Sequence, residues 1–300
     1  MATASAEIQP IARAERIESL EIGQWRAVWL RFRRHRFAIL GIFVLGTFGA
    51  IAVLAPWIAP YGFNDQNLLN RYGLPSQQNW LGTDDLGRDI VTRLMYGARI
   101  SLFVAAVATL LGTLLGVLIG AAGGYFGGWT ETILMRLADI MLSLPALPIL
   151  IIFSAALGPS MQTIIVVLTA FGWMGVARLT HGSVLSLRQR EFTEAARALG
   201  GSAWRIILRH MVPNSLAPII VSATLRLGNV IILEATLSFL GLGINPPIPS
   251  WGNMLQNAQG YVWSAPWLAI YPGACIFVAV LAVNFMGDGL RDALDPRLKI

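Results

Sequence analysis

Long apolar stretches alternate with shorter polar stretches along most of this chain. A helix of about 20 apolar residues crosses the ~30 Å hydrocarbon core of a bilayer. Six stretches meet or approach this requirement, at residues 37–59, 100–122, 137–157, 164–179, 216–240 and 267–286. The pattern therefore predicts an all-α integral membrane protein with six transmembrane helices.

The polar stretches divide the chain into segments with different expected locations. Residues 1–36 are expected to form a cytoplasmic N-terminal segment, and residues 37–300 the transmembrane domain. This domain is expected to comprise a first span at 37–59, an extracytoplasmic loop at 60–99, a five-span core at 100–288, a cytoplasmic loop at 186–213 and a cytoplasmic tail at 289–300. The first apolar stretch is longer than the ~7–15 residues of a signal peptide, so it is expected to remain as an anchor.

Arginine placement gives the expected orientation. Apolar residues line one side of a helix over residues 22–32, and arginines form its polar edge, which suits the headgroup region of a membrane. Further arginines lie in and beside the loop at 186–213, whereas residues 158–163 and 243–266 contain neither lysine nor arginine. The positive-inside rule then places both termini in the cytoplasm.

The loop at 186–213 predicts two short amphipathic helices. Phe192, Ala195, Ala196 and Leu199 recur at helical spacing, and Gly200 can adopt the positive φ that ends a helix. Two such helices in a short loop between membrane spans are expected to present a surface to a partner outside the bilayer.

The second of these helices is expected to begin after Ser202, which can cap it, and to end at Pro213. Its predicted apolar stripe comprises Trp204, Ile207, Leu208 and Met211.

The span at 216–240 carries Arg226, Asn229 and Glu234 among apolar residues. Charges inside a membrane usually face a bundle interior or a wet cavity. Arg226 and Glu234 are separated by roughly 12 Å along a helix, so they do not pair with each other. Two interpretations stay open for each residue: it lines a translocation path at an interface with a second subunit, or it makes a structural bond to a neighbouring helix.

Glycines in two spans predict close helix packing. Gly112, Gly116 and Gly120 form overlapping GxxxG steps on one stripe, and Gly172 and Gly175 suggest a second close contact. A glycine-rich turn is expected over 123–128, and prolines 145 and 148 are expected to kink the following span.

The polar segments outside the membrane carry two further expectations. Residues 82–85 predict a turn and a helix cap, followed by a helix bearing Arg88, Asp89 and Arg93 as an exposed, salt-bridged segment. Its aspartates do not predict a metal site. The segment after residue 240 predicts a non-helical exit loop, with Trp251 as an anchor at the membrane interface.

Composition excludes several function classes. The chain of 300 residues is 55% hydrophobic and 13% charged, which is too apolar for a soluble domain. Its net charge of +6 lies beside the membrane spans, which argues against nucleic-acid binding. Lys299 is the only lysine, so no phosphate-binding Gly-Lys-Ser/Thr loop is present. Cys275 stands alone and cannot form an internal disulfide. We predict no catalytic constellation and therefore no enzyme.

Four stretches carry a family resemblance. Glu194, Ala195 and Ala196, followed by Gly200 and Pro213, are similar to the cytoplasmic EAA coupling loop of ABC importer permeases, with His210 and Val212 departing from the usual pattern. NWLGTDDLGRDIVTRLMYGARISL, SFLGLGINPPIPSWGNML and NFMGDGLRDALDPRLKI resemble the dipeptide, oligopeptide and nickel permease branch of that family. The resemblance covers about residues 37–298.

The resemblance implies the type I ABC importer permease architecture and a transport function. The expected complex contains a second permease subunit, two ATP-binding subunits and an extracytoplasmic substrate-binding protein. No cofactor is expected in this chain, since ATP and Mg²⁺ would be bound by the partner subunits. The expected location is a bacterial or archaeal inner membrane.

Substrate identity stays open in the sequence. Di- or oligopeptides are the first expectation, and nickel chelates, glutathione-like molecules or other small solutes are alternatives within the same machinery. A hypothesis from another class is an ion-coupled secondary transporter with Glu234 as its proton carrier. A third hypothesis is a membrane scaffold that transports nothing.

Overall fold

Every regular element in the described chain is a helix. The computed structural model describes residues 24–294, so predictions for residues 1–23 and 295–300 lie outside it. The helices are α2 Gln24–Arg34, α3 Arg36–Ile58, η1 Leu68–Asn70, α4 Ile90–Phe126, α5 Gly128–Ser143, α6 Ala146–Leu157, α7 Met161–Ala170, α8 Met174–Arg188, α9 Glu191–Ala198, α10 Ala203–Ile206, the π-helical η2 Ile207–Met211, α11 Val212–Asn214, α12 Leu216–Phe239, α13 Trp251–Ala258, η3 Gln259–Tyr261 and α14 Trp267–Leu294.

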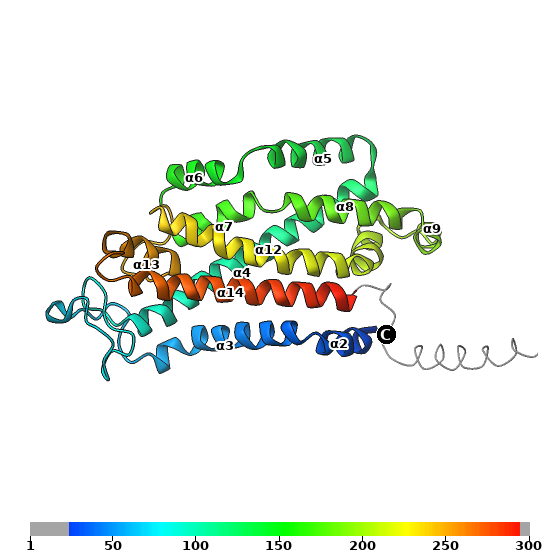
Figure 1. Ribbon diagram of the computed structural model, residues 1–300. Helices are drawn as coiled ribbons and strands as arrows, with labels where there is room; N and C mark the ends of the chain where they lie inside the picture. Colours follow the sequence, from blue (N-terminus) through cyan, green and yellow to red (C-terminus); the bar gives the residue numbers. More distant parts are fainter. Residues whose placement is uncertain (1–23, 295–300) are drawn as a thin grey trace, which may run out of the picture.

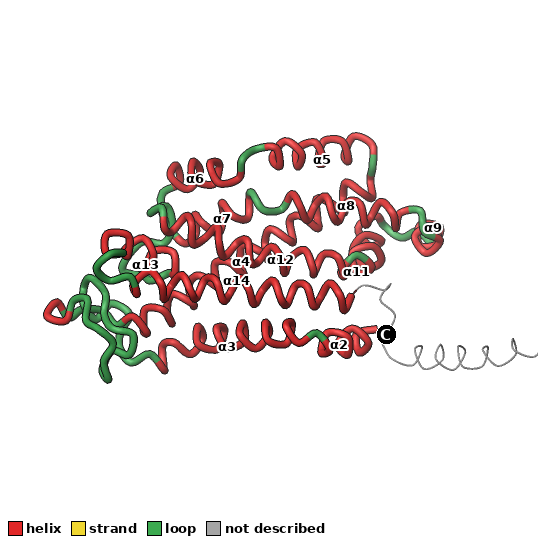
Figure 2. The backbone as a smooth tube through the Cα atoms, in the orientation of Figure 1, coloured by secondary structure: helices red, strands yellow, loops and turns green. Residues whose placement is uncertain are grey.

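The long helices run alongside one another in a bundle (Figure 1). Four single helices, α3, α4, α12 and α14, and the run Met161–Arg188 formed by α7 and α8 are each long and apolar enough to cross a membrane. The bent pair α5 and α6 is a further candidate span. α9 lies at one end of the bundle, here called the α9 end. α13 and most of the loop structure lie at the opposite end, the α13 end (Figure 2).

The kink expected within residues 137–157 is a complete break between two helices. α5 ends at Ser143 and α6 begins at Ala146, with 93° between their axes. Leu144 is extended, with a ψ of 141°, as the ring of Pro145 requires of the residue before it. Pro148 lies in the first turn of α6, where a missing N–H leaves no helix hydrogen bond unmade. The two prolines therefore separate two helices instead of bending one.

α4 extends beyond the span predicted at 100–122 at both ends. Asp89 caps its start, because its carboxylate accepts a hydrogen bond from the Thr92 backbone N–H at 2.8 Å. The helix ends at Gly127, whose φ is +68°. The turn expected over 123–128 therefore begins only at Gly127. Gly124 is still helical and packs against α8, where an added Cβ would lie 3.0 Å from Val184.

Glycines hold α4 close to α8, as the GxxxG steps predict. An added Cβ at Gly116 would lie 2.6 Å from the Trp173 carbonyl oxygen and 2.7 Å from the Val176 Cβ. Gly120 meets the backbone of Ala177 in the same way. No larger residue fits at this separation, so the prediction of close packing is confirmed for these two glycines.

Trp251 is buried in the core and is not the interfacial anchor that the sequence predicts. Only 1% of its surface is exposed, its Nε1 donates to the Leu94 carbonyl at 3.2 Å, and its ring packs edge-on against Phe48. α13 places it there: Ser250 and Asn253 form a capping box that starts this helix inside the bundle. The non-helical exit loop is present between α12 and α13, and the chain then folds back into the bundle as α13.

The amphipathic N-terminal helix is present as α2, but part of its apolar side packs against protein. Phe32 is buried against Ala38 and Ala293, whereas Trp29 and Leu30 are exposed. α2 is thereby held against the end of α14, at the α9 end of the bundle (Figure 1).

We predict that Gly116→Val destabilises the purified protein through overpacking between α4 and α8. Overpacking of a well-packed site costs about 1–3 kcal/mol, so the melting temperature in detergent should fall by several degrees. Gly46→Val is the matched control, because it makes the same change in α3 where no atom lies within 4 Å of the added Cβ. Equal melting temperatures for the two variants would contradict the close packing.

Candidate functional site

α9 forms a capped helix that projects from the α9 end (Figure 1). Glu191 and Glu194 lie in its first turn, where negative charge is favourable. The helix ends as predicted: Gly200 has a φ of +77°, its N–H bonds to the Arg197 carbonyl at 2.9 Å, and the Gly201 N–H bonds to the Ala196 carbonyl at 3.0 Å. These two bonds form a Schellman motif, which rigidly sets the turn after α9.

The second predicted helix is present but broken by a π-helical turn. Ser202 precedes α10 without making a side-chain cap, and Pro213 lies in the first turn of the new helix α11. Ile207 and Met211 of the predicted stripe are buried against α4 and α8. Of the other two stripe residues, Leu208 is exposed, and Trp204 is partly exposed with its ring edge-on against Phe126 of α4.

Large apolar side chains are exposed on this two-helix unit. Leu199 is 88% exposed, and three further side chains are at least 40% exposed: Phe192, Trp204 and Leu208. The predicted coupling residues Glu194, Ala195, Gly200 and Pro213 are also exposed, and Ala196 is half-buried. We call residues 191–213 the α9 surface. Exposed apolar groups mixed with charge are typical of a protein-binding surface.

A cavity of about 1110 Å³ lies between α8, α12 and α14. Its lining residues from α12 recur every three or four positions, so a whole face of this helix borders it. Arg226 and Asn229 line it near the middle of α12, and Asn214 and Arg291 line it at the α9 end. The cavity therefore extends from mid-bundle to the end that carries α9.

Arg226 makes the structural bond that one of the two interpretations expects. Its Nη2 donates to the Leu168 carbonyl at 3.1 Å. α7 ends at Ala170, and the last carbonyls of a helix lack partners within it. The guanidinium lies against Gly112 and Gly172, where any side chain would displace it. Arg226 thus makes a structural bond and also borders the cavity.

Gly172 and Gly175 do not make the close helix contact that the sequence suggests. Gly172 leaves room for the Arg226 guanidinium, and Gly175 has no atom within 4 Å of an added Cβ because it borders the cavity.

Glu234 lies away from the cavity and is 0% exposed. Ser238, four residues further along α12, donates a hydrogen bond to Glu234 Oε1 at 2.8 Å. This geometry favours the structural interpretation for Glu234 over the translocation path. The spacing of the acid and the serine by one helical turn is a sequence signal for such a bond.

The polar and proline residues that line the cavity before Arg226 were not among the predicted site residues. Asn214, Pro218 and Ser222 precede Arg226 at intervals of four residues, and all of them border the cavity. This recurrence of polar and breaking residues is a helical-period signal within an apolar span. Arg291 comes from α14 and leaves no comparable signal, because only the packing of α14 beside α12 brings it there.

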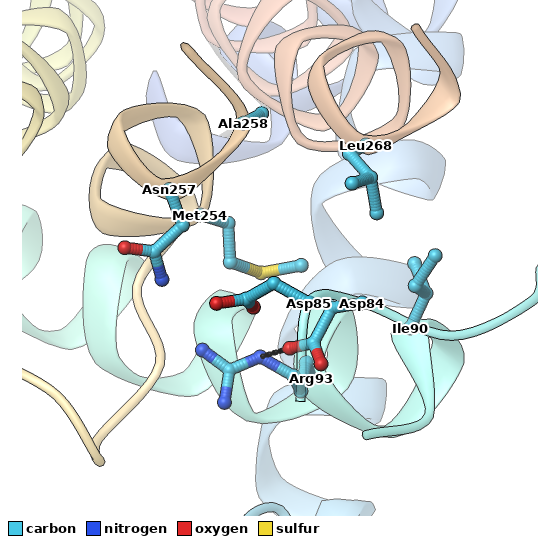
Figure 3. A pocket seen from close by; sticks show the side chains of 8 residues that line it. All are labelled: Asp84, Asp85, Ile90, Arg93, Met254, Asn257, Ala258 and Leu268. Carbon is cyan, nitrogen blue, oxygen red and sulfur yellow. Dashed lines mark ion pairs between the residues drawn. The ribbon is translucent and has the colours of Figure 1, made fainter. Parts of the chain in front are cut away.

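The charged segment after Gly82 is buried and not exposed, contrary to the prediction. Asp84, Arg88 and Arg93 are each less than 10% exposed. Asp84 Oδ2 lies 2.7 Å from Arg88 Nε and 3.3 Å from Arg93 Nε. The loop folds over α13, so Arg93 and Asp84 face Met254 across a cavity of about 20 Å³ (Figure 3). Such a volume holds about one water molecule, so this cluster is a structural network at the α13 end.

Transport-system permeases are similar to this chain along nearly its whole length. The family described as binding-protein-dependent transport system inner membrane component matches residues 112–300, and the N-terminal TM domain of oligopeptide transport permease C matches residues 23–76. A dipeptide transport system permease protein of Alkalihalophilus pseudofirmus is 42% identical over 93% of this chain and 91% of its own length. An oligopeptide transport system permease protein of Bacillus subtilis is 39% identical over 95% of this chain and 94% of its own length.

A further relative is named for glutathione transport, and one solved structure is similar in fold. A glutathione transport system permease protein of Escherichia coli is 40% identical over 99% of this chain and 97% of its own length. An inward-facing structure of the MetNI methionine ABC transporter matches with a TM-score of 0.54 and 19% identity, over 68% of this chain and 96% of the matched chain. At this identity the match concerns the fold alone.

We predict that Asp84→Asn strongly destabilises the loop at the α13 end. The substitution leaves the buried Arg88 and Arg93 without this carboxylate, and breaking a buried pair costs about 3–5 kcal/mol. Asp85→Asn is the control, since Asp85 is more exposed and its carboxylate forms an ion pair within residues 24–294 with Arg88 only, at 3.3 Å. Thermal unfolding in detergent should show a much larger decrease in melting temperature for Asp84→Asn than for Asp85→Asn. Similar decreases for the two variants would contradict the buried network.

Proposed function

This chain belongs to the family of binding-protein-dependent transport system inner membrane components, and we propose that it is the permease subunit of an ATP-driven peptide importer. The proposed substrates are di- or oligopeptides, because relatives named for dipeptide and oligopeptide transport are 42% and 39% identical to it. Glutathione, which is also a small peptide, belongs to the same proposed class.

The observation that carries the proposal is the position of the α9 surface. It joins two walls of the large cavity: α8 leads into α9, and α11 leads into α12. Thr193 in α9 is buried and donates to the Leu187 carbonyl of α8 at 2.8 Å, so the two helices are directly bonded. A force applied to α9 therefore reaches both walls of the cavity through short connections.

We propose that α9 docks on an ATP-binding subunit and that ATP and Mg²⁺ bind to that partner. The exposed Leu199 and Phe192 provide the apolar part of the contact, and Glu194 provides a charge. Two such ATP-binding subunits, a second permease subunit and an extracytoplasmic binding protein complete the proposed assembly. The second permease would cover the open side of the cavity.

Transport in this proposal is a coupling between two conformations. The ATP-binding pair binds one arrangement of α9 more tightly than the other, and this difference in affinity shifts the permease between states. α8 and α12 then move relative to each other and change the access to the cavity. No bond chemistry is assigned to this chain.

The proposed orientation places the α9 end in the cytoplasm and the α13 end outside. The arginines of α2 and those of residues 186–213 lie at the α9 end, and the positive-inside rule favours this end for the cytoplasm (Figure 1). Both chain termini are then cytoplasmic.

Reconstituted transport tests the function. We expect proteoliposomes containing the full assembly to take up at least one labelled peptide, tested as alanine peptides of two to five residues and as glutathione, when ATP is enclosed with the ATP-binding subunits. A protonophore should have no effect. Uptake that persists without nucleotide and collapses with the protonophore, or uptake of none of these peptides, would contradict the proposal.

We predict that Leu199→Ser weakens binding of the ATP-binding subunit by about tenfold or more, since an exposed anchor buried in an interface contributes strongly to affinity. Leu69→Ser is the matched control, because Leu69 is fully exposed at the α13 end. Binding can be measured by co-purification with the tagged partner. Equal retention of both variants would argue against docking at α9.

Glu194→Lys should leave the permease inserted in the membrane but reduce ATP hydrolysis coupled to transport, because it reverses the charge in the proposed contact. Gly200→Asp should act similarly, since a side chain at a φ of +77° strains the turn after α9. Substrate-stimulated ATP hydrolysis is the measurement, and wild-type rates in both variants would refute the coupling role.

A further inference from the structure

Arg226 carries a charge in the middle of a membrane span without a carboxylate partner in the described chain. It lies roughly 15 Å from the start of the 24-residue helix α12. No acidic side chain among residues 24–294 forms an ion pair with it. Its bond to Leu168 uses a neutral carbonyl, and its buried Nε has no hydrogen-bond partner in the part of the chain that the structure describes. Glu234, the other charge of this helix, is bonded to Ser238 instead.

Within residues 24–294, every charged side chain that lines the cavity beside Arg226 is positive. Arg226 and Arg291 are its two charged lining residues, and Asn214, Ser222 and Asn229 supply neutral polar groups. The remaining lining is mainly apolar, which lowers the local dielectric and concentrates the field of the arginines. Such a cavity attracts an anionic group and disfavours a cationic one.

The guanidinium is accessible to a ligand on the cavity side. A guanidinium has five N–H donors, and the bond to Leu168 occupies one of them. Gly172 and Gly175 contribute no side chain that could cover it, and the space beside Gly175 is open. Asn229 lies about one helical turn away on the same face, so its amide can donate to the same ligand.

We propose that Arg226 binds the free carboxylate of the transported solute while it passes through the cavity. The inference rests on the proposed function, and it adds a chemical requirement: the cargo presents a carboxylate, as a peptide C-terminus does. A planar guanidinium matches the two oxygens of a carboxylate. The cavity volume of about 1110 Å³ is large enough for a short peptide. Because the contact comes from only one wall of an open cavity, the solute can also be released from it.

A fixed acid of the second permease subunit is the competing partner for this charge. It would make Arg226 an assembly contact, and its removal would weaken the permease pair whatever the cargo. The two roles therefore differ in uptake per assembled complex, which should fall in the proposed role and stay at the wild-type value in the competing one.

The first experiment compares Arg226→Gln with wild type, using the alanine peptide or glutathione that wild type takes up best. We expect uptake per assembled complex, measured after size-exclusion chromatography, to fall about tenfold. Arg99→Gln is the matched control, because Arg99 is an exposed arginine of α4 and should transport normally. Wild-type uptake in Arg226→Gln, or a loss confined to the amount of assembled complex, would overturn the inference. If the wild-type protein itself takes up the peptide without ATP, this result would instead contradict the proposed function.

A charge-restoration experiment separates loss of charge from loss of packing. Arg226→Cys is made in a Cys275→Ser background, which removes the only native cysteine of this chain, with the partner subunits also free of reactive cysteine. Treatment with aminoethyl methanethiosulfonate restores a positive charge, whereas sulfonatoethyl methanethiosulfonate adds a negative one. We expect uptake to recover severalfold with the first reagent alone. Equal uptake after both reagents would overturn the carboxylate site.

Discussion

The close packing of α4 against α8 is the contact on which the rest of the structure depends. Gly116 and Gly120 let the two backbones approach to distances that no side chain allows. α8 is the helix that this contact positions, and it both borders the cavity and leads into α9. A shift of α8 would move the cavity wall and the α9 surface together. The absence of two side chains in one helix therefore sets the geometry of the functional elements in another.

The two charges of α12 are accommodated in opposite ways. Glu234 is fully buried and accepts a hydrogen bond from Ser238 on its own helix. Arg226 instead satisfies a carbonyl at the end of α7 and borders open space. Burying a charge in a membrane protein is unfavourable unless it gains partners or water. Glu234 gains its partner within the chain, and Arg226 is left able to gain one from outside it.

The α9 surface shows how an exposed unit can remain connected to the membrane core. The Schellman turn at Gly200 and the bond between Thr193 and Leu187 hold α9 in a defined orientation. Ile207 and Met211 anchor the following π turn against α4 and α8. The same segment exposes Leu199 almost completely. A rigid attachment combined with an unpartnered apolar face is suited to transmitting movement from a docked protein.

The sequence by itself determined the class of fold, the apolar segments, the end of α9 at Gly200 and the glycine stripe at which α4 packs closely, because each depends on local periodicity or on a single backbone property. The sequence did not determine that α8 is the helix packed there. Only the tertiary structure decided which face of each helix meets protein or cavity. Trp251 was expected at the interface and is buried, and Asp84 and Arg93 were expected in solvent and form a buried pair. Segments distant in sequence cover these residues, and hydrophobic or charge patterns within one segment carry no information about what folds over it.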